Sequence, residues 1–204
     1  MFSTLTTSFI MASLLSLSAK AAPPALPAGF QRRLAASQLR FRTPAGAVPV
    51  PVVANAQMSY DYAVRFADKG LEVRYAIRPL APLLAEYRVA KNKKNSDLMD
   101  PNELYPTLLM TVVANISGGQ VPQINDFPAE AVRREFRADW GGTTLVPPGR
   151  QFAPGYKYCM VVALHKRNAA DVYCFYLFNK REAINDLMKA ATPDEAAFHA
   201  LRFE

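Results

Sequence analysis

The feature that most constrains the fold is a strict alternation of apolar and polar side chains on both sides of one turn. Apolar residues occupy every second position in residues 58–66 and again in residues 71–77. The four residues between them, Ala-Asp-Lys-Gly, end on Gly70, which suits the positive φ of such a turn. Pairing Phe66 with Leu71 places every apolar side chain on one face. A slip of one residue would turn that set outward, so we expect a β-hairpin in this register.

Three later stretches are apolar on both sides instead of alternating. Residues 155–165 and 172–179 are rich in β-branched and aromatic side chains and are joined by a short polar turn. Thr107–Ile116 has the same character and predicts another strand covered on both faces. Such strands need a layer above and a layer below. Because hairpins join antiparallel strands, we predict an α/β fold of the α+β type, with a mainly antiparallel sheet covered by helices on both faces.

The helices of these layers are predicted between and after the strands. They cover residues 80–90, 128–140, 180–191 and 193–201. In the second helix, Val132, Phe136 and Trp140 recur at a spacing of four, and Gly141-Gly142 would end it. Proline at the first position of this helix is compatible with its start.

The N-terminal region differs in composition from the remainder. Residues 1–21 resemble a signal peptide, because Phe9–Ala19 is apolar but shorter than the roughly 20 residues of a membrane span, and Ala19-Lys20-Ala21 offers a cleavage site. A disordered apolar N-terminus on a cytosolic protein is the alternative. Residues 22–35 form a Pro/Ala-rich linker and residues 36–204 a single domain. We therefore expect export to the periplasm or the extracellular space, with no transmembrane segment in the mature chain.

The charge distribution argues against a nucleic-acid partner. The formal net charge is +7, but residues 1–57 hold five of the 24 basic side chains and none of the 17 acidic ones. The remainder is nearly balanced, whereas a nucleic-acid-binding domain carries a basic stripe on its own surface. We expect no nucleic-acid partner.

Few residues offer recognisable chemistry. The two histidines, His165 and His199, have no paired spacing with other ligands, so no metal site is predicted. Neither a nucleophile elbow nor a glycine-rich phosphate loop occurs, and we expect no cofactor and no catalytic residue. Cys159 and Cys174 lie in apolar strands. They are either a disulfide, as export would permit, or two buried free thiols.

The segment 139–156 is the most informative candidate for recognition. It is predicted to be an irregular loop. It holds the only tryptophan, several glycines and prolines, and the aromatic and basic residues Arg150, Phe152 and Tyr156. Loops on a rigid scaffold often carry recognition residues. We therefore predict a ligand-binding role for Trp140, Arg150 and Tyr156. The alternative is that Trp140 and Phe152 fill the core.

The order of these elements is similar to that of a known family. Leu39–Gly46 (LRFRTPAG) resembles the opening F-x-x-P-x-G strand and turn of the Mog1/PsbP-like family, which includes exported DcrB-like bacterial members. The hairpins at 60–79 and 155–178, with Phe136–Trp140 between them, extend the resemblance over residues 39–191. The resemblance implies an α/β/α sandwich. The family shares no catalytic residues, and its members are mostly binding or assembly-supporting proteins.

We therefore expect an exported, non-enzymatic binding or accessory protein. Its partner would be a protein or a small ligand of the cell envelope. The alternative is an exported hydrolase with an unrecognised active site. That alternative requires a pocket in which Asp139 or His165 meets another polar group at hydrogen-bond distance.

Overall fold

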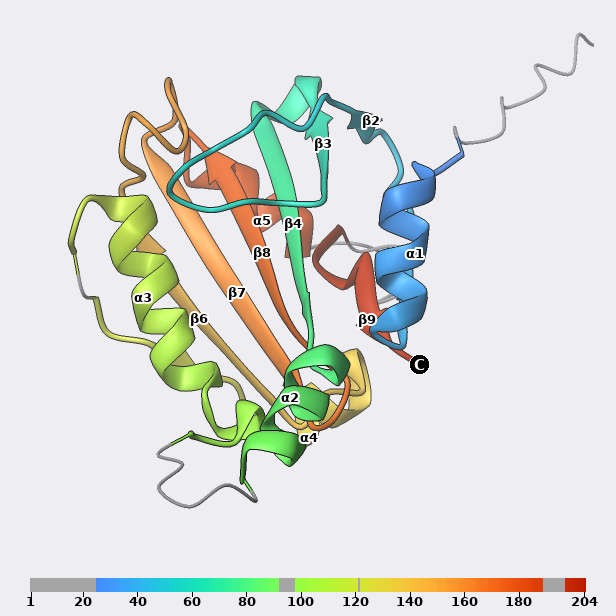
Figure 1. Cartoon of the computed structure of the whole chain (residues 1–204). Helices are drawn as coiled ribbons and strands as arrows, with labels where there is room; N and C mark the ends of the chain where they lie inside the picture. Colours follow the sequence, from blue (N-terminus) through green and yellow to red (C-terminus); the bar gives the residue numbers. More distant parts are fainter. Residues whose placement is uncertain (1–24, 92–97, 121, 189–196) are drawn as a thin grey trace, which may run out of the picture.

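Two antiparallel meanders meet in one sheet. The computed structural model describes residues 25–91, 98–120, 122–188 and 197–204. The first meander comprises β2 (Val48–Pro49), β3 (Tyr62–Phe66) and β4 (Leu71–Pro79). The second comprises β5 (Asn125–Asp126), β6 (Trp140–Val146), β7 (Tyr158–Lys166) and β8 (Ala170–Phe178). Pairing of β4 with β8 gives a seven-stranded sheet of order β2-β3-β4-β8-β7-β6-β5, in which every pair is antiparallel (Figure 1).

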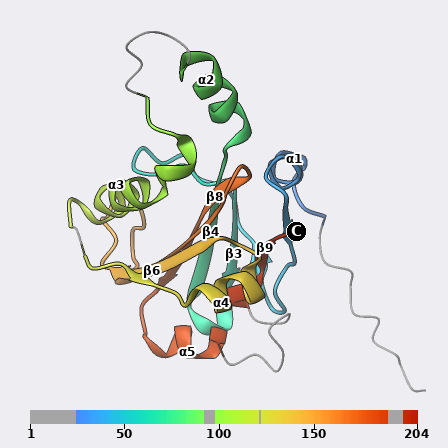
Figure 2. The ribbon, with the colours of Figure 1, turned by 90° about the horizontal axis from the view of Figure 1, so that it is seen from below.

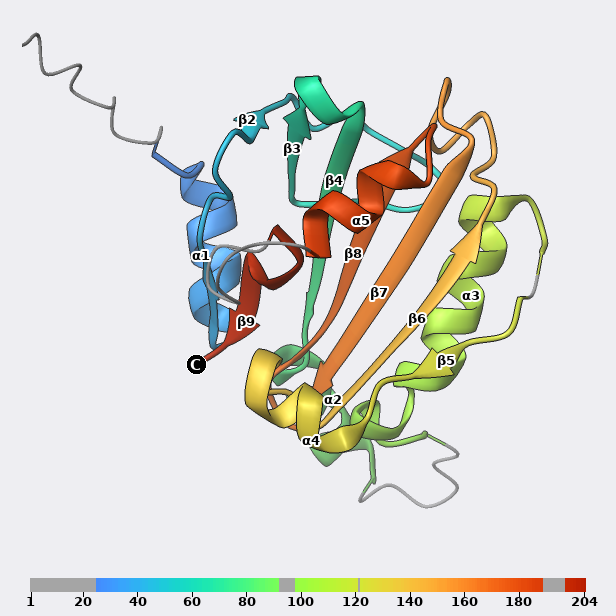
Figure 3. The ribbon, with the colours of Figure 1, turned by 180° about the vertical axis from the view of Figure 1, so that it is seen from behind.

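Helices cover both faces of this sheet, as predicted. On one face lies α3 (Tyr105–Ser117), in front of β6 in Figure 1. The opposite face, seen in Figure 3, carries α1 (Ala28–Ala36), α4 (Ala129–Ala131) with its π-helical continuation Val132–Phe136, and α5 (Glu182–Met188). A two-stranded ladder of β1 (Leu39–Phe41) and β9 (Leu201–Phe203) completes that layer. α2 (Ala81–Lys91) lies to one side of these layers in the view from below (Figure 2).

The first hairpin has the predicted register. Tyr62 pairs with Tyr75, and Phe66 pairs with Leu71 across a turn in which Gly70 has a φ of 60°. The alternation does not continue to residue 58, because the chain bends at Asp61. The Asp61 carboxylate accepts a hydrogen bond from the Ile77 amide at 2.7 Å. It takes the place of the backbone carbonyl that would accept this bond if β3 continued.

This bend corrects the prediction for the first residues of the hairpin. Tyr60 and Met58 were expected on the same face as Tyr62. They pack instead against the core on the α3 face, whereas Tyr62 belongs to the core on the opposite face.

The sheet separates two apolar cores. The core on the α3 face includes Leu109, Val113, Ile116, Phe152, Val161 and Phe175. The core on the opposite face includes Phe30, Leu34, Val64, Tyr75, Leu164 and Phe203. All nine residues of β8 are buried, which is the two-sided burial that the apolar runs of β7 and β8 predicted.

The prediction of a strand at Thr107–Ile116 was wrong, because this segment is most of helix α3. Leu109, Val113 and Ile116 are buried and recur at helical spacing, while Thr107 and Thr111 are exposed. A proline in the first turn and Gly118 in the left-handed conformation, with a φ of 74°, mark its two ends. A buried helix face thus outweighed the β-branched composition.

The predicted end of the helix at Gly141-Gly142 was also wrong. The helical segment ends at Phe136, with Arg137 in the left-handed conformation, and both glycines lie inside β6. A Cβ on Gly142 would lie 2.8 Å from the Trp140 ring, and one on Gly141 would lie 3.1 Å from Leu164. These glycines therefore permit close packing on the two faces of a strand, and Trp140 belongs to that strand and not to a helix.

The structure differs from the prediction at the N-terminal linker and at the C-terminal helix. Within the predicted linker 22–35, residues from Ala28 onward form α1, whose Phe30 and Leu34 enter the core. Of the predicted helix 193–201, the described part is a 3₁₀ turn at Ala197–His199, followed by strand β9. The predicted signal peptide, residues 1–21, lies outside the described residues. Among the helices that are described, none is long and apolar enough to cross a membrane.

Candidate functional site

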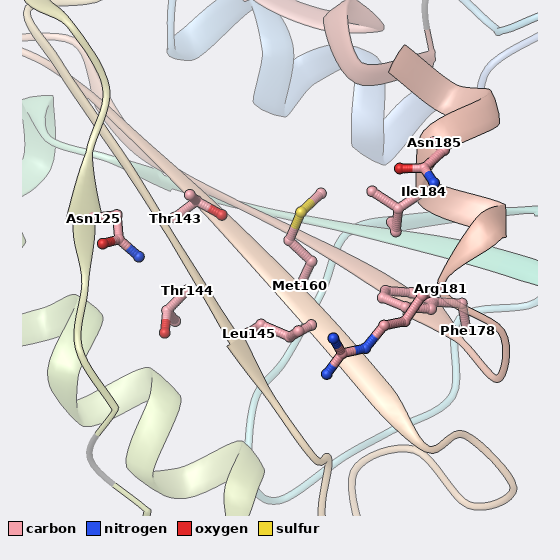
Figure 4. Close-up of a pocket in the computed structure, with 9 residues that line it drawn as sticks. All are labelled: Asn125, Thr143, Thr144, Leu145, Met160, Phe178, Arg181, Ile184 and Asn185. Carbon is pink, nitrogen blue, oxygen red and sulfur yellow. The ribbon is translucent and has the colours of Figure 1, made fainter. Parts of the chain in front are cut away.

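A cavity of about 300 Å³ lies on the sheet face that carries α5. We call it the α5 cavity. Its lining residues come from β5, β6, β7, the end of β8 and the start of α5 (Figure 4), and they are Asn125, Thr143, Thr144, Leu145, Met160, Phe178, Arg181, Ile184 and Asn185. The cavity is at the lower end of the usual volumes of small-molecule sites.

The cavity exists because α5 does not extend over the β6 edge of the sheet. α5 sends Ala183 and Ile184 toward the core on this face. Leu145 of β6, at 43% exposure, is left partly open to solvent, and its cross-strand partner Met160 is half-buried. The result is an apolar floor flanked by two amide side chains, those of Asn125 and Asn185, on different sides of the cavity (Figure 4).

The hydroxyl groups beside this floor are engaged with the backbone. Thr143 Oγ1 donates to the Val161 carbonyl at 3.0 Å, and Thr144 Oγ1 donates to the Gln123 carbonyl at 2.9 Å. Both hydroxyls keep lone pairs that can accept a hydrogen bond. They tie the β5–β6 edge to its neighbours and so hold one wall of the cavity in place.

Arg181 supplies the positive charge of the α5 cavity. It directly precedes α5, and its side chain reaches from the α5 side toward Leu145 (Figure 4). The guanidinium lies 5.4 Å from the centre of the Tyr158 ring, a cation–π contact. No carboxylate among the described residues forms an ion pair with Arg181. A cation that has no ion pair among the described residues and lies beside an apolar floor can bind an anion that carries an apolar group.

The three residues predicted to bind a ligand are not brought together. Trp140 is the first residue of β6, Arg150 is exposed in the turn after β6, and Tyr156 precedes β7. The length of β6 alone, six residue steps, separates Trp140 from Val146 by roughly 20 Å. Seven residues of the predicted loop 139–156 form this strand. Trp140 lines a second cavity, of about 440 Å³, on the α3 face.

Tyr156 belongs to a buried ionic cluster, which we call the Glu72 cluster. Glu72 accepts hydrogen bonds from Arg65 at 2.6 Å, from Arg74 at 2.8 Å and from the Tyr156 hydroxyl at 3.2 Å. The Arg74 guanidinium also donates to the Phe152 carbonyl at 2.6 Å. Burial disfavours the Glu72 carboxylate, but the hydrogen bonds from the two arginines outweigh it and hold the pKa of Glu72 below its ordinary value. These contacts satisfy the buried charges and make the cluster structural.

The two cysteines are free thiols on opposite faces of the sheet. Cys159 enters the core on the α3 face and Cys174 the opposite core, and Cys159 pairs with Leu177 in the register. Of the two alternatives, this arrangement is that of buried thiols. Burial raises the pKa of both, that of Cys174 to about 12, so neither is a reactive thiolate.

The histidines form buried or half-buried pairs with carboxylates. His165 Nδ1 lies 2.7 Å from Asp171, which also accepts a hydrogen bond from Arg78 at 2.6 Å. His199 Nε2 lies 3.0 Å from Glu135. His165 is 4% exposed and lines neither of the two cavities described above. Within the described residues, no three His, Cys, Asp or Glu side chains are grouped as metal ligands.

Asp139, the other residue named for the hydrolase alternative, also meets a polar group. Its carboxylate accepts a hydrogen bond from the Arg167 amide at 2.8 Å, in the turn between β7 and β8. This contact ties that turn to the start of β6. Asp139 lines neither the α5 cavity nor the cavity at Trp140.

Sequence reasoning missed the α5 cavity because its residues are distributed over five elements. Most of them lie within the predicted strands 155–165 and 172–179, the predicted helix 180–191 and the predicted loop 139–156, but none was predicted to bind a ligand. The one available signal was Arg181, a cation placed directly between an apolar strand and an amphipathic helix.

Comparison with known proteins adds no identification. The chain matches no protein-family model, no curated protein and no solved structure.

The Glu72 cluster yields a prediction on stability and its pH dependence. Glu72→Gln should lower the free energy of unfolding at pH 7 by about 3 kcal/mol, because it leaves buried Arg74 without its counter-charge. The folded-state pKa of Glu72 is below its unfolded value of about 4.3. Its contribution is therefore present above that pH and is lost as the pH falls through the folded-state pKa. Denaturant unfolding between pH 7 and pH 2 measures both effects.

The matched control is Glu86→Gln, which removes an equal charge from the exposed surface of α2. It should change the stability by less than about 0.5 kcal/mol at pH 7. A deficit of Glu72→Gln that stays constant down to pH 2 would contradict the role of Glu72 as a paired carboxylate.

Proposed function

We propose that this protein is an exported, non-enzymatic binding protein, and that its ligand is a small amphipathic anion held in the α5 cavity. The observation that carries the proposal is Arg181, a cation with no ion pair among the described residues, beside an apolar floor. An apolar group of the ligand would lie over Leu145, Met160 and Ile184. Its carboxylate would accept hydrogen bonds from Arg181 and from the amide of Asn185 or Asn125.

The energetic terms favour a ligand with both parts. Each methylene removed from water contributes about 0.8 kcal/mol, and a hydrogen bond to a charged group adds about 1.5–3 kcal/mol. In a cavity of about 300 Å³, a short-chain carboxylate can both bury its methylene groups and accept a hydrogen bond from the arginine. A multiply charged ion would leave the apolar floor unused.

Two further considerations support a binding role. The order of the hairpins predicted from the sequence resembles that of the Mog1/PsbP-like family, and this resemblance implies a binding or assembly-supporting protein. The His165–Asp171 pair could transfer a proton, but neither residue lines the α5 cavity. The α5 cavity therefore does not support the hydrolase alternative through this pair.

Export is proposed on the N-terminal sequence. Cleavage after Ala21 would release a mature chain beginning at Ala22. Expression of the full chain in a bacterium and mass spectrometry of the periplasmic and secreted fractions test this. The expected species starts at Ala22, and Ala19→Lys should block its formation because the cleavage site needs small residues. Recovery of only the uncleaved chain in the cytosol would contradict export.

The ligand proposal is tested with hexanoate and its neutral counterpart, 1-hexanol. Met160 lies on the cavity floor and is one of seven methionines, so [¹³C]methyl-methionine labelling gives a direct signal, assigned with Met160→Leu. Saturable shifts of the Met160 methyl resonance are expected with hexanoate. Arg181→Gln should weaken hexanoate binding about tenfold by removing the charged hydrogen bond, while 1-hexanol binding stays the same.

Arg150→Gln is the matched control, because Arg150 is an exposed arginine outside the cavity and carries the same charge. It should leave hexanoate binding within about twofold of the unsubstituted protein. Equal weakening by Arg150→Gln and Arg181→Gln would contradict a specific role for Arg181. So would a Met160 resonance that does not respond to hexanoate.

A further inference from the structure

The second cavity lies on the opposite face of the sheet and is built from different chemistry. It is lined by Tyr105, Pro106, Thr107, Met110, Ile124, Asp126 and Trp140, and we call it the Trp140 cavity. Its volume of about 440 Å³ exceeds that of the α5 cavity. The first turn of α3 forms one wall, and the β5–β6 edge forms the other.

Two aromatic rings line this cavity, and contacts with neighbouring residues fix their orientations. The Tyr105 and Trp140 ring centres are 4.8 Å apart, with a tilt of 42°. The Tyr105 ring also stacks on His165, with the ring centres 4.4 Å apart, and His165 is held by Asp171. Gly142 leaves room for the Trp140 ring to lie along β6, since a Cβ there would lie 2.8 Å from it. The rings are therefore positioned before any ligand binds.

The Trp140 cavity carries a carboxylate that has no counter-ion among the described residues. Asp126 lies in its lining and is exposed. The other two carboxylates whose charge reaches Tyr105 are paired, Glu103 with Arg167 at 2.9 Å and Asp171 with Arg78 at 2.6 Å. Burial raises the pKa of the Tyr105 hydroxyl, and the negative charges of Glu103, Asp126 and Asp171 raise it further. The Trp140 cavity thus combines aromatic walls with one carboxylate, that of Asp126, which has no ion pair among the described residues.

We infer that the Trp140 cavity binds an organic cation, of the ammonium class, with its charge between the aromatic rings and the Asp126 carboxylate. Aromatic faces attract cations through their quadrupole, and tryptophan is the strongest of them. The carboxylate adds a direct Coulomb attraction. The apolar side chains of Met110 and Ile124 contact the substituents on nitrogen. An anion would meet Asp126, and a purely apolar ligand would leave that charge without a partner.

The cavity is independent of the proposed function. It shares no residue with the α5 cavity and lies across the sheet from it. The only tryptophan of the chain is in this site, so its fluorescence reports occupancy here. The methyl group of Met110 gives a second signal, separate from that of Met160.

The test compares choline with its neutral isostere, 3,3-dimethylbutan-1-ol, at constant ionic strength. Choline should change the fluorescence of Trp140 saturably and shift the Met110 methyl resonance, while the Met160 resonance stays in place. The isostere should bind at least about tenfold more weakly, because it has the shape without the charge.

Asp126→Asn should weaken choline binding about tenfold without unfolding the chain, since Asp126 is exposed. Glu130→Gln is the matched control: it removes one negative charge from an exposed position outside the cavity and should leave choline binding unchanged. Thermal unfolding confirms that both variants are folded.

Three results would overturn the inference. The first is equal binding of choline and its isostere, and the second is equal binding by Asp126→Asn and the unsubstituted protein. The third is the absence of a saturable response to choline. A saturable response to the neutral sugar methyl β-glucoside in its place would show that the cavity binds neutral ligands. The hexanoate experiment can succeed or fail independently, because it is followed at Met160.

Discussion

The fold depends on burying both faces of the ladder between β4 and β8. This ladder pairs nine residues of each strand, from Leu71 with Phe178 to Pro79 with Ala170. It joins two meanders that are far apart in the sequence, and all nine residues of β8 are buried. A sheet of this kind is stable only when apolar layers cover it on both sides. The positions of α3 on one face and of α1, α5 and the β1–β9 ladder on the other follow from that need.

The charged residues of the central strands are compatible with this burial because they are paired. Glu72 and Arg74 occupy one end of β4, and Asp171 joins Arg78 and His165 at the other end of the sheet. A buried charge without a partner would cost several kcal/mol. Each cluster also fixes a segment outside the sheet. The Glu72 cluster holds the turn that contains Phe152 and Tyr156, and His165 supports the ring of Tyr105 in α3.

The sequence predicted the parts of the fold that depend on local alternation. The register from Tyr62 to Phe66 follows from the requirement that one set of side chains be apolar. The helical nature of residues 107–116 was missed because β-branched composition was given more weight than the exposed positions four residues apart, Thr107 and Thr111. The glycines of β6 were interpreted as a stop, since their role depends on Trp140 and Leu164, contacts that only the folded sheet creates.

The two cavities were beyond sequence reasoning for the same reason. Arg181, Met160 and Asn125 line one cavity because the chain segments that carry them lie beside one face of the sheet, and nothing local in the chain predicts this arrangement. Trp140 was predicted from the sequence to bind a ligand, but the residues that line a cavity with it, Tyr105 and Asp126 among them, come from α3 and β5 and not from the segment 139–156. Residues of β5 and β6 line both cavities, one on each face of the sheet.

Native-state amide hydrogen exchange, resolved by residue, tests the central claim most directly. If both faces of β8 are covered, the amides at the middle of β7 and β8, such as those of Val161 and Phe175, exchange only through global unfolding. Their exchange free energies should then equal the free energy of unfolding and fall with denaturant at the same slope, while amides near the edge strand β2 exchange through smaller openings. Exchange of the β7 and β8 amides through local openings that are insensitive to denaturant would contradict a sheet covered on both sides.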